Sequence, residues 1–302
     1  MSLIRVPTHY SQHRSDSGRI ASGIDTSDEE KSAVGSVRQL QNIPKALRDI
    51  FVPAPGNVFV GGDWAGIEWA IMIWLAHARG TGPAGFHEEL LDRFFEAKFD
   101  PHCWLAAHAF GLDYEDLFRR HKAGESLKPR KLAKPYTHGY DYDGTPEGLA
   151  KSNHQPVEIG RKVCTAHDKA FLLRDLKTLL VTEATERGYA QTEAGFRRYF
   201  WDPIVVREGK QITPKPSEIL SHYGSGNAAD LCKWELGNMY EEIPADWRLR
   251  TTTHDSFVIE VPESQADDGA AWLLAQMQRA VPFLGGRRWR ADVRIGRDWR
   301  SV

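Results

Sequence analysis

With 302 residues and a hydrophobic content of 41%, the chain is long enough for one large or two medium globular domains with cores of their own. Its net charge of −2 excludes a protein that is cationic as a whole, so a nucleic-acid partner would have to bind a local basic surface. The three cysteines are scattered and form no CxxC pair, which argues against a disulfide framework or a structural zinc site and fits a reducing cytosol.

The first 38 residues are polar and rich in Gly and Ser, and they lack the apolar core of a signal peptide. Their acidic cluster, between Asp25 and Glu30, is typical of a solvated loop rather than of a metal site. The longest apolar run of the chain, Ala70 to Ala76, is too short to cross a bilayer. We therefore expect a cytoplasmic protein that has no membrane partner.

From Phe51 onward the sequence becomes strongly apolar and predicts a strand followed by a helix. Val58–Val60 is typical of a buried strand, and Ile67–Ala78 is typical of a buried helix. Asp63 lies between these two segments. We therefore expect its carboxylate at the C-terminal edge of the strand.

The segment from about residue 84 to 187 is predicted to be mostly helical. Apolar residues recur at helical spacing in HEELLDRFFEAKF, in WLAAHAF and in FLLRDLKTLLVTEATERGY. Positive charge is concentrated within sixteen positions of this segment, at Arg119, Arg120, Lys122, Lys128, Arg130, Lys131 and Lys134.

Beyond residue 188 the pattern becomes mixed again. Pro and Gly interrupt residues 195–226, and an Ala-rich helix is predicted to start near Asn227. The runs RLRTTT and FVIEV have the composition of two strands and lie close enough in sequence to form a hairpin. Asp255 is expected at or beside the turn of this hairpin.

Asp63 and Asp255 thus stand at the ends of two predicted strands. Mg²⁺ takes hard oxygen ligands and is usually held by one or two carboxylates together with phosphate oxygens and water. With two such ions about 4 Å apart, one activates an attacking 3′-hydroxyl while the other stabilises the leaving pyrophosphate. Taken alone, each aspartate is more simply a cap or a turn residue. Together with the basic segment between them, they point to metal-dependent nucleotidyl transfer by a nucleic acid polymerase.

Arg130, Lys134, His138 and Tyr142 follow one another at intervals of four residues. On a helix this spacing gives a stripe about 18 Å long, similar in length to a nucleoside triphosphate. Arg130 and Lys134 are expected at the phosphates, because a guanidinium fork and an ammonium are the usual phosphate partners. The rings of His138 and Tyr142 are expected over the sugar and base. Pro135 lies inside this row, so either the helix begins near it or the helix is kinked there.

Three segments of the chain resemble the sequence motifs of the family A DNA polymerases, the class of bacterial DNA polymerase I. VFVGGDWAGIEWAI resembles motif A, RKLAKPYTHGYDYDG resembles motif B, and TTTHDSFVIEV resembles motif C. Linking segments are similar to family segments in the same order: SGR at 17–19, LQNIP at 40–44, DPHCWLAAHAFGL at 100–112, RGYAQTEAGFRRY at 187–199, GSGNAADLCK at 224–233 and IGRDW at 295–299. The resemblance covers nearly the whole chain.

The resemblance implies a metal site and a nucleotide site. Asp63 and Asp255 match the catalytic, metal-binding aspartates, and the carbonyl of Trp64 matches a further metal ligand. Two Mg²⁺ ions are the implied cofactors, with Mn²⁺ as a substitute. Glu68 matches the steric gate that crowds a ribose 2′-hydroxyl. The remaining dNTP contacts are matched by His102, Arg130, Lys134, His138 and Tyr142.

The resemblance also implies contacts with primer and template. Arg19 matches the arginine that reads the primer terminus from the minor groove, and His254 is expected to support the primer end. Ser225 stands where a template-contacting Gln is common. Primer–template DNA and dNTPs are the partners that follow, in a bacterial or phage-infected cell.

The sequence departs from the family pattern at several positions. Ser256 replaces the usual Glu of motif C, Asp143 replaces the Gly that follows the motif B tyrosine, and His138 replaces a Phe or Tyr. The resemblance begins within the palm, so we expect neither a thumb nor a 3′–5′ exonuclease domain before it, and we expect the C-terminus to be complete. A separate chain that supplies a thumb, exonuclease or processivity function is left open.

The expected fold class is α+β, with an antiparallel palm sheet and an inserted helical fingers subdomain. The expected domains are palm at 1–83, fingers at 84–187 and palm again at 188–302. Two alternatives to a DNA polymerase remain. One is a single-subunit RNA polymerase, which Glu68 disfavours. The other is a non-catalytic, polymerase-like subunit that binds primer–template, which the presence of both aspartates disfavours.

Overall fold

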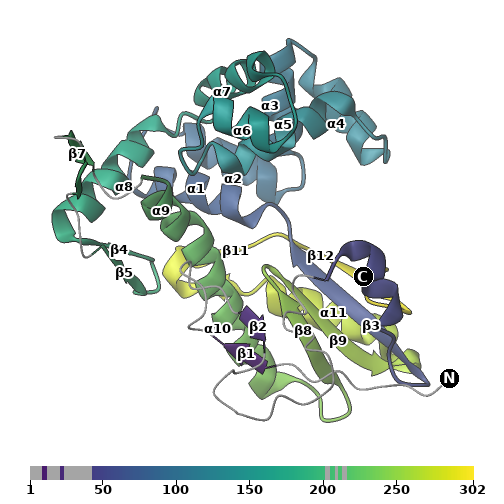
Figure 1. The fold of residues 1–302 in the computed structure, drawn as a ribbon. Coiled ribbons are helices and arrows are strands. Elements are labelled where there is room, and N and C mark those ends of the chain that lie inside the picture. The colour runs from purple at the N-terminus through teal and green to yellow at the C-terminus, as the bar shows by residue number, and fades with distance from the viewer. Residues whose placement is uncertain (1–8, 12–20, 24–42, 201–204, 208–209, 213–215) are drawn as a thin grey trace. The chain divides into compact units, whose positions relative to one another are not determined.

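Two compact units make up the chain in the computed structural model, which describes residues 9–11, 21–23, 43–200, 205–207, 210–212 and 216–302. The first, called the sheet unit, comprises the described residues of Met1–Ala65 and Ala228–Val302 (Figure 1). The second, called the helical unit, comprises the described residues of Gly66–Asn227. The helical unit is therefore inserted into the chain of the sheet unit.

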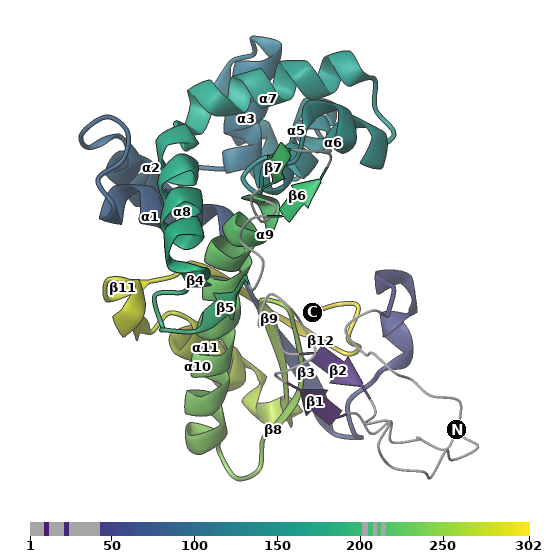
Figure 2. The same ribbon diagram turned by 60° about the vertical axis from the view of Figure 1, so that its left-hand side comes forward.

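The sheet unit is built on four antiparallel strands in the order β12-β3-β9-β8 (Figure 2). Their bounds are β3 (Asn57–Trp64), β8 (Arg248–Thr253), β9 (Ser256–Pro262) and β12 (Ala291–Gly296). The central strands β3 and β9 carry the β-branched and aromatic residues that favour a pleated, buried surface. Asp63 lies on β3 of this sheet, and Asp255 lies in the turn that joins β8 to β9.

Two helices and several short elements complete the sheet unit. Helix α11 (Ala266–Met277) packs against β3, β9 and β12, and α10 (Asn227–Glu242) contacts β8 through Cys232 Sγ, which lies 3.5 Å from Thr252 Oγ1. The short elements are β1 (His9–Ser11), β2 (Ala21–Gly23), η2 (Lys45–Ile50), η4 (Glu263–Gln265), β10 (Ala280–Val281), η5 (Pro282–Leu284) and β11 (Arg287–Arg288).

Adjacent glycines of β3 show how closely the two faces of the sheet are covered. A Cβ on Gly62 would lie 2.4 Å from Sδ of Met277 in α11. A Cβ on Gly61 would lie 2.7 Å from Cβ of Val302, on the opposite face. Any side chain at these positions would displace one of the two neighbours, so the Gly-Gly pair allows both layers to approach the strand.

The helical unit packs around a buried tryptophan. The ring of Trp69 contacts those of Phe94, Phe99 and Phe171 at centroid distances of 5.3 to 5.5 Å. The helices are α1 (Ile67–Ala78), α2 (Phe86–Phe95), α3 (Pro101–Phe110), α4 (Tyr114–Lys122), α5 (Lys128–Gly139), α6 (Pro146–Ser152), α7 (Val157–Phe171), α8 (Arg174–Arg187), α9 (Pro216–Ser221) and the π-helical η3 (His222–Gly226). Two small hairpins are formed by β4 (Tyr189–Gln191) with β5 (Arg197–Tyr199), and by β6 (Val205–Arg207) with β7 (Lys210–Ile212).

The bounds of α3 follow from its local sequence. The side chain of Asp100 accepts a hydrogen bond from the Cys103 N–H at 2.7 Å and caps the first turn. Pro101 suits the first position of the helix because it has no backbone N–H that would need an acceptor. The helix ends at Gly111, whose φ of 65° lies in the left-handed region that glycine adopts readily. These signals place the predicted nucleotide-binding residue His102 in the first turn of α3.

The predicted α+β fold class is confirmed, with an antiparallel sheet and an inserted helical segment. The helix predicted at Ile67–Ala78 and the helix predicted to start near Asn227 are confirmed as α1 and α10. The structural units divide at residues 65/66 and 227/228. The palm and fingers boundaries at 83/84 and 187/188 stay a prediction. No helix in the described part of the chain is long and apolar enough to span a membrane.

Candidate active site

Asp255 lies in the two-residue turn that joins β8 to β9. Thr253 pairs with Ser256, which leaves only His254 and Asp255 between the strands. His254 has a φ of 56°, the positive value that such tight turns require. The Trp64 N–H donates to the Asp255 carbonyl at 3.2 Å, so the turn is tied to the end of β3. The predicted hairpin with Asp255 at its turn is confirmed.

Asp63 lies beside this turn on the central strand β3. It pairs with Ser256, the residue that follows Asp255. The neighbouring Trp64 faces α11, because its indole Nε1 donates to the Met277 carbonyl at 2.8 Å. Successive strand residues alternate in direction, so Asp63 points to the face opposite α11. Asp63 is exposed and Asp255 is half-buried, so both carboxylates remain within reach of solvent.

A third carboxylate, which the sequence reasoning missed, faces the same side of the sheet. Asp292 of β12 pairs directly with Asp63, and directly paired residues of antiparallel strands share a face. Its side chain is 63% exposed and lies 4.0 Å from the guanidinium of Arg290. Only the register of β12 with β3 reveals this proximity, since the two aspartates are 229 positions apart in the sequence.

The donor set at this end of the sheet fits a divalent cation. Among the described residues, no group of three or more His, Cys, Asp or Glu side chains is arranged as a ready metal cage. Mg²⁺ does not need such a cage, because one or two carboxylates commonly hold it together with phosphate oxygens and water. Asp63 and Asp255 offer these two carboxylates on neighbouring backbone positions. The Trp64 carbonyl belongs to the same end of β3.

The basic row of the sequence lies on and just beyond α5. The helix runs from Lys128 through Pro135 to Gly139, so the alternative in which it begins near Pro135 is wrong. The expectation of one helical stripe through Tyr142 is also wrong, because the helix ends three residues earlier. Asp143 has a φ of 62°, which the helix cannot accommodate and which explains why glycine suits this position. Arg130, Lys134 and His138 therefore share α5, whereas Tyr142 lies in the turn that follows.

Arg130 is already engaged by a carboxylate within the helical unit. Its Nε and Nη2 donate to the two Asp100 oxygens at 3.0 and 2.8 Å. Burial alone would raise the pKa of Asp100, but the bonds from Arg130 outweigh it and hold that pKa far below its ordinary value. The charge of Arg130 is thus largely compensated, in contrast to the exposed Lys134. Sequence reasoning missed Asp100 because its cap position in α3 gave no sign of this second role.

His102 is held as a neutral donor or acceptor rather than as a cation. It is 7% exposed, and its Nδ1 lies 2.9 Å from Oγ1 of Thr137 on α5. Burial lowers the pKa of His102 to about 3, despite the opposing effect of Asp100. Its ring lies 5.8 Å from that of His138 in an edge-to-face arrangement. His102 can therefore offer a hydrogen bond to a ligand at neutral pH but not a positive charge.

Glu68 on α1 is bonded to residues from two other segments of the helical unit. The Tyr142 hydroxyl donates to Glu68 Oε2 at 2.7 Å, and the Ser225 hydroxyl donates to Glu68 Oε1 at 3.0 Å. Ser225 is only 5% exposed. The structure thus places Ser225 against the predicted sugar-selecting residue, whereas its predicted contact with template is untested. Of the other primer contacts, His254 is exposed in the β8–β9 turn, and Arg19 lies outside the described residues.

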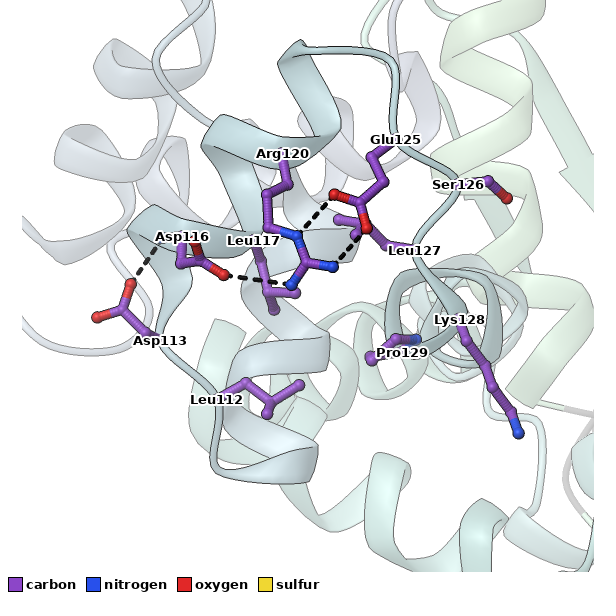
Figure 3. A pocket seen from close by; sticks show the side chains of 10 residues that line it. All are labelled: Leu112, Asp113, Asp116, Leu117, Arg120, Glu125, Ser126, Leu127, Lys128 and Pro129. Atoms are coloured by element: carbon purple, nitrogen blue, oxygen red, sulfur yellow. Dashed lines mark hydrogen bonds and ion pairs between the residues drawn. The ribbon is translucent and has the colours of Figure 1, made fainter.

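A separate pocket of about 320 Å³ lies beside α4 and the start of α5 (Figure 3). Arg120 projects into it and is held by its own neighbours, with Nε donating to Glu125 at 2.7 Å and Nη1 donating to Asp116 at 3.3 Å. Much of the basic segment near residue 120 is therefore paired with nearby acids. None of the predicted site residues lines this pocket, so it is no candidate for the nucleotide site.

Comparison with known proteins identifies what this chain resembles. The family model described as DNA polymerase family A matches residues 3–301. The chain is 27% identical over 308 residues to the thermostable DNA polymerase I of Thermus filiformis, which covers 98% of this chain and 32% of that protein. It is 26% identical to the thermostable DNA polymerase I of Thermus aquaticus, covering 99% and 33% of the two chains. The chain therefore spans about a third of the length of these curated relatives.

A solved structure shows the same fold. The POL domain of Pol1 from M. smegmatis, in complex with DNA primer-template and dNTP, matches 98% of this chain with a TM-score of 0.75. The sequence identity is 23%, and the match covers 48% of that structure. At this identity the likeness concerns the fold.

Proposed function

The chain belongs to DNA polymerase family A, and on this premise we propose that it is a template-directed DNA polymerase that adds dNTPs to the 3′ end of a primer. The observation that carries the proposal is the placement of Asp63 and Asp255. They occupy neighbouring positions at one end of the sheet, and Asp63 faces away from α11. This is the arrangement that two carboxylates need to share divalent cations.

We assign Asp63 and Asp255 to metal binding, with Mg²⁺ as the preferred ion and the Trp64 carbonyl as a further ligand. Ions held there would supply positive charge to activate the attacking 3′-hydroxyl and to stabilise the leaving pyrophosphate. Lys134 is assigned to the triphosphate because its exposed ammonium provides positive charge on α5. His102 is assigned a hydrogen bond to the triphosphate, since its pKa of about 3 keeps it neutral.

The remaining assignments follow the family resemblance. His138 and Arg130 are assigned to the incoming nucleotide, and Arg19 and His254 to the primer. We retain primer–template DNA and dNTPs as the partners, palm and fingers as the identities of the sheet and helical units, and a cytoplasmic location. The bonds that hold Glu68 in place favour selection of deoxyribose, and hence a DNA polymerase over an RNA polymerase.

The proposal is tested by primer extension with the purified chain, dNTPs and Mg²⁺. Asp63→Asn and Asp255→Asn should each abolish extension while leaving primer–template binding nearly intact, because they remove metal-binding charge without altering contacts with phosphates. The matched control is Asp267→Asn, which changes an exposed aspartate on α11. Extension by either site variant at the control rate would contradict the assignment. Direct Mn²⁺ binding, followed by electron paramagnetic resonance, should weaken in the same two variants.

A further inference from the structure

Ser225 is a buried hydroxyl at a position where the family commonly has a longer amide side chain. It lies in η3, the π-helical turn between α9 and α10, and is 5% exposed. A buried hydroxyl is usually retained only where it has a partner, because burial without a hydrogen bond is destabilising. Its partners therefore indicate what the side chain does.

Two of its partners are the carboxylate of Glu68 and the hydroxyl of Tyr142. Ser225 Oγ donates to Glu68 Oε1 at 3.0 Å and lies 3.3 Å from the Tyr142 hydroxyl oxygen. Tyr142 donates to the other carboxylate oxygen, Oε2, at 2.7 Å. Each oxygen of Glu68 thus accepts a hydroxyl donor from a different segment of the helical unit. Two donors on one carboxylate fix both the position and the plane of the group.

The π-helical turn is what brings Ser225 to this position. A π-turn inserts one extra residue into a helix and changes the direction of the side chains around it, and such turns are frequent at functional sites. Gly224 in the same turn lies against Tyr142, since a Cβ there would be 2.3 Å from the tyrosine oxygen and 2.6 Å from its ring. Gly224 leaves room for the ring, and Ser225 then reaches the carboxylate. The two residues act together on Glu68 and Tyr142.

We propose that Ser225 is a positioning residue for sugar selection, whose hydroxyl holds the Glu68 carboxylate where it excludes a ribose 2′-hydroxyl. This inference rests on the proposed polymerase function, in which Glu68 lies beside the sugar of the incoming nucleotide. Glu has three rotatable side-chain bonds, so each hydroxyl that donates to its carboxylate further restricts the movement of that group. With Ser225 in place, the group stays where it restricts the space for the sugar.

The expected effect of losing this bond is a reduced preference for dNTPs over rNTPs. The lower end of the usual contribution of a hydrogen bond to a charged group corresponds to about a factor of ten. We therefore expect Ser225→Ala to lower the ratio of kcat/KM for dNTP to that for the matching rNTP about tenfold. Ser225→Thr retains the hydroxyl and should restore most of the ratio. Ser225→Cys, which keeps the size but donates weakly, should resemble Ser225→Ala.

The experiment measures this ratio by single-nucleotide addition to a primer for the wild type, Ser225→Ala, Glu68→Ala and the double variant. The matched control is Ser221→Ala, which removes a hydroxyl that donates to the Glu218 carbonyl one turn away, at 3.2 Å. If Ser225 acts through Glu68, its substitution lowers the ratio in the wild type but has no further effect in the Glu68→Ala background. A general loss of stability would instead lower dNTP and rNTP addition together and leave the ratio unchanged.

Each outcome separates this inference from the function on which it rests. An active wild type whose ratio stays within about twofold after Ser225→Ala overturns the inference and leaves the proposed function standing. An equal fall of the ratio in both backgrounds also overturns it, because Ser225 would then act independently of Glu68. A wild-type chain that adds no nucleotide overturns both.

Discussion

Glu235 gives the prediction whose magnitude follows most directly from the structure. Its side chain lies on α10 and is 1% exposed, and the Nε of Arg279 lies 3.7 Å from its Oε1. Burial raises the pKa of Glu235 to about 7, and the attraction of Arg279 offsets only part of this effect. Arg279 also pairs with Glu242 on the surface, so its charge does not depend on Glu235 alone.

The raised pKa makes stability depend on pH in a defined direction. The folded chain binds a proton at Glu235 more tightly than the unfolded chain does. The free energy of unfolding is therefore highest below about pH 4.5, where Glu235 is protonated in both states, and it falls as the pH rises through about 7. The difference between the ordinary pKa of 4.5 and a pKa of about 7 corresponds to about 3 kcal/mol. Glu235→Gln replaces the group by a neutral amide of the same shape. At pH 8 the variant should therefore be more stable than the wild type by up to about 3 kcal/mol, whereas at pH 5 this difference should fall below about 1 kcal/mol.

Urea unfolding of both proteins at pH 5, 6, 7 and 8 tests this prediction. The matched control is Glu241→Gln, which alters an exposed glutamate on the same helix and should give the same difference from the wild type at every pH. A stability gain for Glu235→Gln that does not vary with pH would refute the reasoning, as would a variant less stable than the wild type at pH 8. Either result would mean that Glu235 is charged and well paired in the folded chain.

Further predictions concern the helical unit and α10. Asp100→Asn keeps an acceptor at the α3 cap but removes the charge that pairs with Arg130, so it should destabilise the chain by about 2 kcal/mol in urea unfolding; a loss below about 0.5 kcal/mol would count against the pair. Lys134→Ala should raise the KM for dNTP and slow incorporation in steady-state kinetics, because a cation at the triphosphate stabilises developing charge; a change in DNA affinity alone would assign Lys134 to the DNA surface instead. Gly224→Ala should destabilise the chain by about 1–3 kcal/mol in urea unfolding, because the new methyl group overlaps Tyr142. Gly237→Ala, at an exposed position of α10 with open space around it, should stabilise the chain by about 0.5–1 kcal/mol. If Gly224→Ala and Gly237→Ala changed the free energy of unfolding equally, the packing of Gly224 against Tyr142 would be contradicted.

Local sequence patterns were sufficient to predict the elements that carry the aspartates. The apolar run at Ile67–Ala78 gave the helix with its observed bounds, and the two Thr- and Val-rich runs gave the hairpin around Asp255. These elements depend on short-range propensity and on alternation of apolar residues, which are visible in the sequence. The positions of Asp63 and Asp255 at the ends of strands followed from them.

Contacts between distant segments could not be predicted in the same way. The pairing of Asp292 with Asp63 depends on strand register, and the bond between Asp100 and Arg130 depends on how α3 packs against α5. Regular four-residue spacing suggested that Tyr142 continues the α5 stripe, but the positive φ of Asp143 marks a turn that this spacing does not reveal. The link from Ser225 to Glu68 depends on a π-helical turn, for which the Gly-Ser-Gly sequence is no specific signal.

Template-directed nucleotide addition is the central claim, and one measurement tests it most directly. The purified chain is incubated with Mg²⁺ and four primer–templates that differ only in the first unpaired template base, each with one dNTP at a time. The account predicts that each primer gains the complementary deoxynucleotide much faster than the other three, and that EDTA stops the addition. Absence of any addition, or addition of the same nucleotide whatever the template base, would contradict it.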